Sequence, residues 1–273
     1  MPISSVVAID NLDLDELAPY RTMKRDGQHR KQRIFVAEGD KVVDRLLDSH
    51  FEVISVLLPD KRLESLGAKM ESRPEAIKVF TAERRLLESL TGFSMYQGVL
   101  AVGRVPDAVS ADAILERTPA PRLLAAVEDL TNAENLGGMV RNCAGMGVDA
   151  LVVGESCSSP YLRRAVRSSM GAIFKLPVVE TPNLAHTLME IRRRGVRIIA
   201  AHPHTHHSRL SRARLDLDCC IVFGSEGFGL SETILDLADE AMAIPMRNEV
   251  DSLNVASASA AFLHEAARQQ GKV

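Results

Sequence analysis

The second half of the chain alternates apolar runs with helical segments, and this alternation constrains the fold most. From Arg122 onward, runs rich in Val, Ile and Leu recur at residues 123–127, 150–153, 175–179, 197–201, 220–223 and 241–244. Between them, helical spacing of apolar residues begins near Leu136, Tyr161, Leu184 and Ser231, and a last helix runs from Val255 towards Gln270. Strands this apolar, separated by helices, indicate a parallel sheet covered on both faces. Ligands of such sheets bind in the loops at the carboxyl ends of the strands.

The first third of the chain predicts a second, smaller α/β layer structure. We expect an opening helix at residues 12–20, strands at 34–37, 53–58, 77–80 and 97–102, and helices after Gly39, after Pro59 and at 83–90. The segments around Pro106 and Pro119 flank a short helical stretch and form the best linker in the chain. The sequence therefore predicts an N-terminal domain at 1–104, a linker at 105–121 and a C-terminal domain at 122–273.

The composition is that of an ordinary globular protein, with 273 residues, 46% hydrophobic and 25% charged. No run approaches the roughly 18 apolar residues that a membrane span requires, and the acidic start of the chain does not resemble a signal peptide. The four cysteines, Cys143, Cys157, Cys219 and Cys220, lack CxxC spacing. We therefore expect reduced thiols in a cytoplasmic protein without a membrane partner.

Basic residues gather in local patches, although the formal net charge is only −3. Six cations between residues 21 and 33 are accompanied by one acid, Asp26, and further clusters lie at 163–167 and 209–214. Such a patch can hold RNA phosphates on a mildly acidic protein; the alternative is chance grouping of solubilising charge. The triple at 192–194 lies late in a predicted helix, where cations suit the helix dipole. The predicted RNA-binding residues are Arg21, Lys24, Arg25, Arg30, Lys31 and Arg33.

Three polar loops, at residues 135–141, 223–230 and 244–255, each follow a predicted strand and are expected to meet at one edge of the sheet. In the second loop Glu226 lies between glycines, which permit positive φ and close approach to a flat ligand. A carboxylate there suits a ligand with a positive charge or an amino group. The spacing is not GxGxxG, and the chain has no GxxxxGK[ST] phosphate loop, which disfavours other nucleotide-binding α/β enzymes.

Each polar residue of these loops also has a purely structural interpretation. Asn135 could cap the helix that begins near Leu136, and Ser252 and Asn254 could cap the last helix. Arg141 could pair with an acid instead of binding a phosphate or a ribose. The order and mutual placement of these residues, more than any one of them, therefore indicate a site.

The run His202-Pro203-His204-Thr205-His206-His207 raises the question of a zinc site. It follows the strand at 197–201, with no nearby cysteine pair and no carboxylate until Asp216. We therefore predict no metal site and place the run in a solvated or RNA-facing loop.

The three loops, read as Asn-x-Gly-x-x-x-Arg, Phe-Gly-Ser-Glu-Gly-x-Gly-Leu and Ile-Pro-Met-x-x-x-Val-x-Ser-Leu-Asn-Val, resemble the motifs of the SpoU (TrmH-type) RNA 2′-O-ribose methyltransferases of the SPOUT superfamily. Residues 167–172 resemble the family's segment between motifs one and two. Residues 35–39 and 97–99 are similar to its ribosomal-protein-like substrate-binding domain. Two departures are Ala256, where many members have Ser, and Met95-Tyr96, where a proline is common.

The resemblance implies an S-adenosylmethionine-dependent enzyme whose C-terminal parallel sheet is tied in a deep trefoil knot, with the site at a homodimer interface. It implies a key role for the arginine of motif one, here Arg141, to which the family in some cases assigns the role of general base. Our hypothesis is instead that Arg141 orients the RNA phosphate and stabilises a developing alkoxide, while Asn135 fixes the ribose. Glu226, Ser252 and Asn254 would order the polar end of the site. The expected cofactor-binding residues are Gly224, Glu226, Gly229, Ile244, Met246 and Leu253.

Ribosomal RNA ranks ahead of transfer RNA as the expected substrate, because a separate substrate domain is present. The alternatives are a transfer RNA 2′-O-methyltransferase and a catalytically inactive RNA-binding or assembly protein.

Overall fold

The computed structural model describes residues 3–91, 98–205 and 208–273. The chain divides into two compact units, one of Met1–Asp107 with Tyr161–Lys175 and one of Ala108–Pro160 with Leu176–Val273. Residues 161–175, which the sequence places in the C-terminal domain, thus group with the N-terminal unit. The functional division at 104 and 122 stays a prediction.

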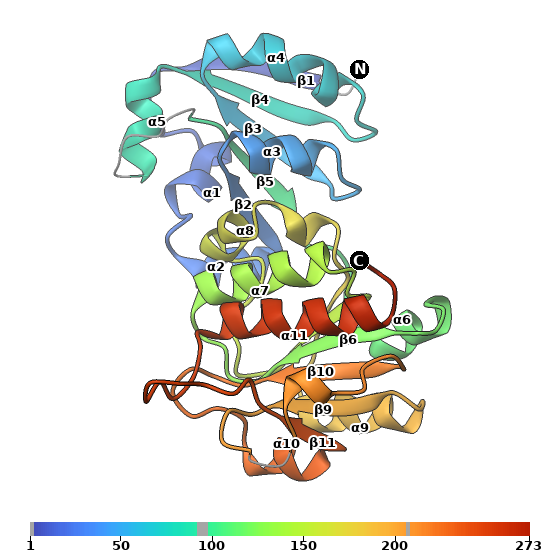
Figure 1. The fold of residues 1–273 in the computed structure, drawn as a ribbon. Coiled ribbons are helices and arrows are strands. Elements are labelled where there is room, and N and C mark those ends of the chain that lie inside the picture. The colour runs from blue at the N-terminus through green and yellow to red at the C-terminus, as the bar shows by residue number, and fades with distance from the viewer. Residues whose placement is uncertain (1–2, 92–97, 206–207) are drawn as a thin grey trace. The chain divides into compact units, whose positions relative to one another are not determined.

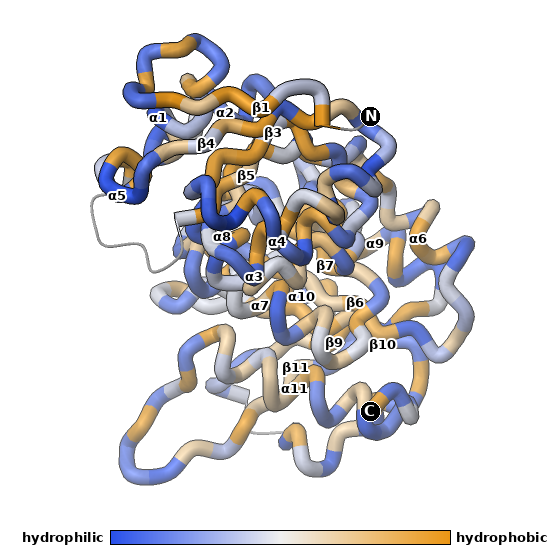
Figure 2. Tube along the Cα trace, turned by 90° about the horizontal axis from the view of Figure 1, so that it is seen from above, coloured by the Kyte–Doolittle hydropathy of each residue, from blue (hydrophilic) through white to orange (hydrophobic). Residues whose placement is uncertain are grey.

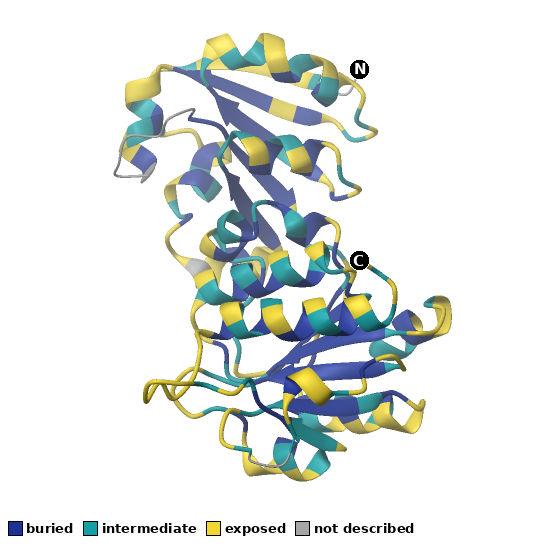
Figure 3. Ribbon diagram, viewed as in Figure 1, coloured by how far each residue is buried: buried dark blue, intermediate teal, exposed yellow. Residues whose placement is uncertain are grey.

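The second unit contains a six-stranded sheet in the order β11-β9-β10-β6-β7-β8, and every neighbouring pair is parallel. The predicted parallel sheet is therefore confirmed. The predicted strands at 175–179 and 241–244 are shifted by up to three residues. Lys175 lies before the hydrogen-bonded part of its strand, and Ile244 lies beyond the end of its strand. The strands are β6 Leu123–Val127, β7 Ala150–Val153, β8 Val178–Glu180, β9 Arg197–Ala201, β10 Cys219–Phe223 and β11 Glu240–Met242. All residues of β6, β7 and β10 are buried (Figure 3).

Helices cover both faces of this sheet, in agreement with the apolar character of its strands (Figure 1). On one face, α6 Ala111–Arg117, α9 Leu184–Arg193 and α10 Glu232–Leu237 share a hydrophobic core with alternate strand residues. On the other lie α7 Ala133–Gly145 and α11 Val255–Gln269, where Phe262 packs edge-on against Phe223 at a centroid distance of 5.8 Å. The short η3 Leu210–Arg212 lies between β9 and β10. The five α-helices begin at side-chain N-caps, namely Ser110, Asn132, Asn183, Ser231 and Asn254.

Helices α7 and α11 lie side by side (Figure 1). A Cβ atom built on Gly138 would lie 3.0 Å from the Cβ of Ala256, so the contact accepts only small residues. Asn142 donates from Nδ2 to the carbonyl of Ala256 at 2.6 Å and to Oγ of Ser259 at 2.9 Å. The small residues at the start of α11 therefore allow the two helices to approach closely.

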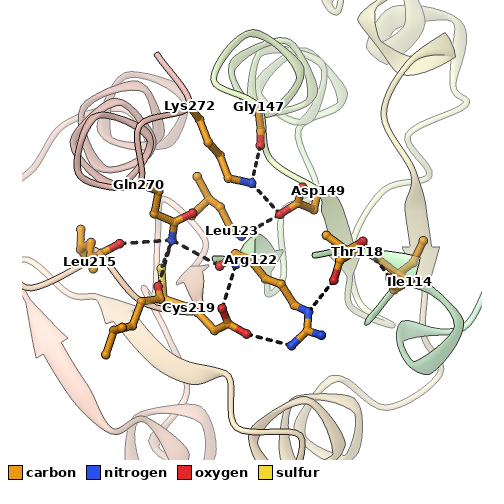
Figure 4. A network of polar contacts seen from close by, with 12 residues as sticks. Ile114, Thr118, Arg122, Leu123, Gly147, Asp149, Leu215, Cys219, Gln270 and Lys272 are labelled. Atoms are coloured by element: carbon orange, nitrogen blue, oxygen red, sulfur yellow. Dashed lines mark hydrogen bonds and ion pairs between the residues drawn. The ribbon is translucent and has the colours of Figure 1, made fainter. Parts of the chain in front are cut away.

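Charged and amide side chains close the amino-terminal edge of the same sheet (Figure 4). Nη1 of Arg122 lies 2.8 Å from Asp218, and Nζ of Lys272 lies 2.8 Å from Asp149. Gln270 donates to the carbonyls of Leu217 and Leu215 at 2.9 and 3.1 Å and to that of Arg122 at 3.3 Å. The C-terminal residues are thus held at the amino-terminal edge of the sheet, opposite to the strand ends that carry the motif loops.

The N-terminal unit is built on a five-stranded sheet in the order β1-β4-β3-β5-β2. Strands β1, β4 and β3 run parallel to one another, and β5 runs antiparallel to its neighbours β3 and β2. Apolar colour marks β3 in Figure 2, in keeping with its central position. The strands are β1 Ile3–Ile9, β2 Ile34–Glu38, β3 Val53–Leu58, β4 Ile77–Ala82 and β5 Leu100–Arg104. The predicted strand at 97–102 therefore starts later, and Met95, Tyr96 and Gln97 lie outside the described residues.

Two predictions for the start of the chain are wrong. No strand was predicted at Ile3–Ile9, because this edge strand keeps most of its residues exposed, including Val6 and Val7, and shows no clear apolar alternation. The expected helix at 12–20 shrinks to η1 Asp15–Leu17 and α1 Ala18–Arg21, since the Asn11 side chain accepts from Asp13 N–H in a turn. The other described helices before residue 108 are α2 Asp26–Gln32, α3 Asp40–Leu47, α4 Asp60–Glu71 and α5 Arg84–Thr91.

The segment Tyr161–Lys175 packs into the N-terminal unit through an aromatic and an ionic contact. It carries α8 Arg163–Ser168 and η2 Ala172–Phe174. The ring of Phe174 lies 5.6 Å from Phe35 and 5.4 Å from Phe51, measured between centroids. The buried carboxylate of Glu38 accepts hydrogen bonds from Arg163 and, at 3.3 Å, from Arg167. These contacts explain why the segment belongs to this unit.

Candidate active site

Three loops of the second unit meet around one carboxylate oxygen. Nδ2 of Asn135 donates to Oε1 of Glu226 at 2.6 Å. Nδ2 of Asn254 donates to the same oxygen at 2.8 Å and to Oδ1 of Asn135 at 3.1 Å. We call these three residues the amide–carboxylate cluster. The sequence therefore placed these three loops correctly at one point.

The first member of the cluster is free for this contact because another residue caps α7. Oδ1 of Asn132 accepts from the backbone N–H of Glu134 at 2.9 Å and of Asn135 at 3.1 Å. Asn135 is thus not the N-cap that its sequence position suggested. It lies in the first turn, where its side chain projects outward and can reach Glu226.

Asn254 both caps a helix and belongs to the cluster, the two roles that the sequence left open. Its Oδ1 caps α11 by accepting from the N–H of Ala256 at 3.0 Å and of Ser257 at 3.4 Å. Its Nδ2 is directed to Glu226 and Asn135. The start of α11 and the geometry of the cluster therefore depend on one side chain.

Glycines shape the loop that carries Glu226. Ser225 and Gly229 exchange backbone hydrogen bonds of 3.1 and 3.0 Å, and Gly229 has a φ of 71°. A Cβ atom on Gly224 would lie 2.2 Å from the backbone of Gly229, which only glycine avoids. The tight turn leaves Glu226 and Phe228 exposed at its tip, and the Phe228 side chain is 93% exposed.

A cavity of about 190 Å³ lies beside the cluster. Its apolar wall includes Phe223, Val255 and Phe262, and Ser252 also lines it. Within the described part of the chain, Ser252 makes no hydrogen bond, so it caps no helix here. All the predicted cofactor-binding residues line this one cavity: Gly224, Glu226, Gly229, Ile244, Met246 and Leu253.

The first two histidines of the His202 run line this cavity. Pro203 and His204 are exposed in a loop after β9, as predicted, whereas His202 is only partly exposed. The backbone N–H of His202 donates to the carbonyl of Met242 at 2.9 Å and places the ring beside the sheet. Burial, with a smaller contribution from His204, lowers the pKa of His202. His206 and His207 lie outside the described residues. No group of three potential metal ligands occurs among the residues that were placed.

Arg141 is not at the cluster within one chain. It follows Asn135 by six helical positions, which corresponds to about 9 Å along α7 and about 120° around it. Its side chain is exposed, does not line the cavity, and forms no hydrogen bond or ion pair with any described residue. The alternative pairing with an acid is therefore absent from this part of the chain.

The predicted RNA-binding residues fall into two groups. Arg21 donates to the carbonyls of Leu12 and, at 2.8 Å, Leu14, and Arg33 donates to that of Pro106 at 2.5 Å, so both help to hold the local chain. The other four are exposed, and their side chains make no polar contact with a described residue: Lys24, Arg25, Arg30 and Lys31. Lys24 also lines a cavity of about 300 Å³ together with Arg163 and Arg164. The sequence grouped these arginines separately, because they come from a distant segment.

Comparison with known protein families identifies the family of the second half of the chain. The model of the SpoU rRNA Methylase family matches residues 122–264, just over half of the chain. The chain belongs to the SpoU family. The resemblance inferred from the three motifs is thereby confirmed.

Relatives extend the similarity beyond the SpoU region. An uncharacterized tRNA/rRNA methyltransferase of Mycobacterium tuberculosis is 32% identical over 273 residues, covering 98% of this chain and 93% of the relative. The 23S rRNA (guanosine-2′-O-)-methyltransferase RlmB of Pectobacterium atrosepticum is 31% identical over 215 residues, covering 78% of this chain and 86% of RlmB. Similarity to the first relative thus includes the N-terminal unit.

Solved structures establish the fold. The SpoU methyltransferase AviRb from Streptomyces viridochromogenes, in complex with AdoMet, has a TM-score of 0.81 at 23% identity, covering 94% of this chain and 98% of AviRb. An AdoMet-bound rRNA methyltransferase from Sinorhizobium meliloti has a TM-score of 0.81 at 21% identity, covering 96% and 98%. The predicted SPOUT-type α/β architecture is confirmed, and the trefoil knot stays a prediction from the sequence.

Proposed function

We propose that this SpoU-family protein transfers the methyl group of S-adenosylmethionine to a ribose 2′-hydroxyl of RNA. The observation that carries the proposal is the amide–carboxylate cluster at the edge of a cavity lined by every predicted cofactor-binding residue. The similarity to RlmB, which is a 23S rRNA (guanosine-2′-O-)-methyltransferase by name, supports the same reaction type.

The residues of the cavity fit S-adenosylmethionine. Apolar walls from Phe223, Ile244 and Phe262 suit the adenine ring, and the backbone at Gly224 can approach it closely. The carboxylate of Glu226 suits the positive charges of the sulfonium and amino groups. When bound, this cofactor supplies an electrophilic methyl group. The protein must then orient the ribose oxygen for attack, and such positioning can supply much of the rate.

The cluster can perform this orientation because its hydrogen bonds leave groups available. Asn135 uses Nδ2 towards Glu226 and Oδ1 towards Asn254, and its second amide hydrogen can donate to a ribose oxygen. Both amide donors of the cluster meet Oε1 of Glu226, which leaves Oε2 to accept from a ligand. Ser252 offers a further hydroxyl in the cavity wall.

We propose a homodimer in which the second copy brings Arg141 to the cluster. The exposure of Arg141 and its position about 120° around α7 from Asn135 support a role towards another molecule. There its guanidinium would bind an RNA phosphate and stabilise the developing alkoxide. A role as general base is disfavoured, because the pKa of arginine exceeds about 12.

Ribosomal RNA is the proposed substrate, ahead of transfer RNA. The N-terminal unit carries Lys24, Arg25, Arg30 and Lys31, exposed cations that suit a phosphate backbone. The four free cysteines suit a reducing cytoplasm. No helix among the described residues is long and apolar enough to span a membrane. A catalytically inactive assembly protein would have no need of a complete cluster, which disfavours that alternative.

The proposal is tested by mapping 2′-O-methyl groups in ribosomal and transfer RNA from cells with and without the gene. We expect one ribosomal position to lose its methyl group and to regain it when purified protein and S-adenosylmethionine are added. Glu226→Gln should not restore it, whereas the matched control Glu232→Gln, at an exposed carboxylate on α10, should. Unchanged maps together with no binding of the cofactor would reject the function.

A further inference from the structure

One buried polar atom of the cavity wall has no partner in the described protein. This atom is Nδ1 of His202. The other buried, unpartnered side-chain atoms among the described residues belong to Asp40, Arg62 and Gln270, none of which lines this cavity. Buried polar groups in native proteins are nearly always hydrogen-bonded, and leaving one unpaired is costly. Because Nδ1 is itself inaccessible, a proton added to it would be buried without an acceptor, which favours the neutral ring.

The imidazole of His202 is held at one place by its surroundings. The residue lies directly after β9, and its backbone N–H is bound to Met242 at 2.9 Å. Pro203 follows, and the ring of His204 packs edge-on against that of His202 at 5.6 Å between centroids. The titratable groups among the described lining residues are these two histidines and Glu226. His202 thus lines the cavity from a fixed backbone position.

The charge state of this ring matters because the donor and the product differ in charge. S-adenosylmethionine carries a permanent sulfonium cation, whereas the sulfur of S-adenosylhomocysteine is neutral. Burial and the neighbouring His204 lower the pKa of His202, so the ring is neutral at pH 7. A unit charge about 12 Å away, at an effective dielectric constant of about 20, changes affinity about tenfold. A sulfonium bound in the cavity that His202 lines would lie within such a distance.

We propose that His202 stays neutral in the wall of the cofactor cavity, and that protonation of its ring weakens binding of the cationic donor more than binding of the neutral-sulfur product. This inference rests on the proposed function, since it concerns the cofactor of the same site. It makes His202 a determinant of donor-over-product selectivity. Acidification would shift the protein from the donor-bound towards the product-bound form, with Glu226 partly offsetting the added charge.

The test is calorimetric titration of the full-length protein with S-adenosylmethionine and with S-adenosylhomocysteine at pH 7 and pH 5. For the wild type, we expect Kd for the donor to rise more than Kd for the product on acidification, by up to about tenfold. His202→Gln keeps a polar side chain but cannot titrate, so this excess should disappear. His204→Gln, the matched control from the same loop, should retain most of it. An excess that survives in His202→Gln, or vanishes only in His204→Gln, overturns the inference.

A measurement on the wild type alone covers the case that a variant does not fold. NMR titration of histidine-labelled protein should show the pKa of His202 falling further when S-adenosylmethionine is bound. If the donor binds and that pKa does not move, the inference is wrong and the proposed function stands. If the donor binds at no pH, the proposed function itself is wrong.

Discussion

Asn135 donates a hydrogen bond to Glu226 over 2.6 Å, although 91 residues separate the two in the chain. Asn254, a further 28 residues on, donates to the same carboxylate oxygen. Each partner comes from a different loop at the carboxyl edge of one parallel sheet. The position of the carboxylate is therefore set by the sheet and two amides together, and no single loop fixes it.

Substitutions of Asn254 should separate its capping role from its role in the cluster. Asn254→Ala removes the cap of α11, so the free energy of unfolding should fall by about 1 kcal/mol. Asn254→Asp keeps the capping oxygen and adds a favourable charge at a helix N-terminus. It also places a carboxylate against Glu226 instead of a donor. We therefore expect near wild-type stability in urea unfolding but strongly reduced methyl transfer for Asn254→Asp. Full transfer activity would remove the shared amide from the mechanism.

The sequence was sufficient to predict the convergence of the loops, because apolar strands separated by helices imply a parallel sheet, and its strand ends share an edge. It could not decide which asparagine caps α7, since Asn132 and Asn135 lie within one turn of each other. It also could not place His202, because nothing local distinguishes a cavity wall from a solvated loop. That distinction depends on Met242, which pairs with His202 only in the folded sheet.

The contact between Gly138 and Ala256 gives a stability prediction. Gly138→Val would force side-chain atoms into α11, so the free energy of unfolding should fall by about 1–3 kcal/mol. The matched control is Gly145→Ala in the same helix, where nothing lies within 4 Å of the added Cβ. That variant should be neutral or more stable by up to about 1 kcal/mol. Urea unfolding of both variants measures the difference. Equal free energies of unfolding for the two variants would show that α7 and α11 can move apart without loss of stability.

Local patterns were least informative for the segment Tyr161–Lys175. Its helical spacing was visible, but its assignment to the N-terminal unit depends on contacts with Phe35 and Glu38, more than 100 positions earlier in the chain. Such long-range partners leave no periodic signal. The edge strand β1 was missed for a related reason. Its extended structure is stabilised by pairing with β4, and its mostly exposed side chains give no sign of that pairing.

The buried thiols predict a loss of stability at alkaline pH. Burial raises the pKa of Cys143 and Cys220, and raises that of Cys219 to about 12. The folded state then keeps protons that the unfolded state loses above about pH 8.5. The stabilisation is thus complete below that pH and decreases as the pH rises, by about 1.4 kcal/mol per pH unit for each thiol. Urea unfolding at pH 7.5 and 9.5 under reducing conditions should show it.

A matched variant identifies the source of that pH dependence. Cys143→Ala removes one titrating group, so the decrease in unfolding free energy between the two pH values should be smaller than in the wild type. An unchanged decrease in the variant would assign the alkaline sensitivity to other groups.

The proposed exchange of Arg141 between two copies can be tested by mixing inactive variants. Arg141→Ala and Glu226→Gln should each abolish most methyl transfer as pure proteins. In a mixed dimer, one site combines the intact Glu226 of one copy with the intact Arg141 of the other. Random pairing makes about half of the dimers mixed, each with one good site of two, so co-expression should restore about a quarter of wild-type activity.

The same experiment distinguishes the alternative in which both residues act within one chain. Every site of a mixed dimer would then lack either Arg141 or Glu226, and co-expression would restore nothing. The helix geometry favours the first outcome, because Arg141 points about 120° away from Asn135 along α7. A co-expressed pair of Asn254→Ala and Glu226→Gln is the control. These two residues share a hydrogen bond within one chain, so that pair should stay inactive if the cluster is built as found.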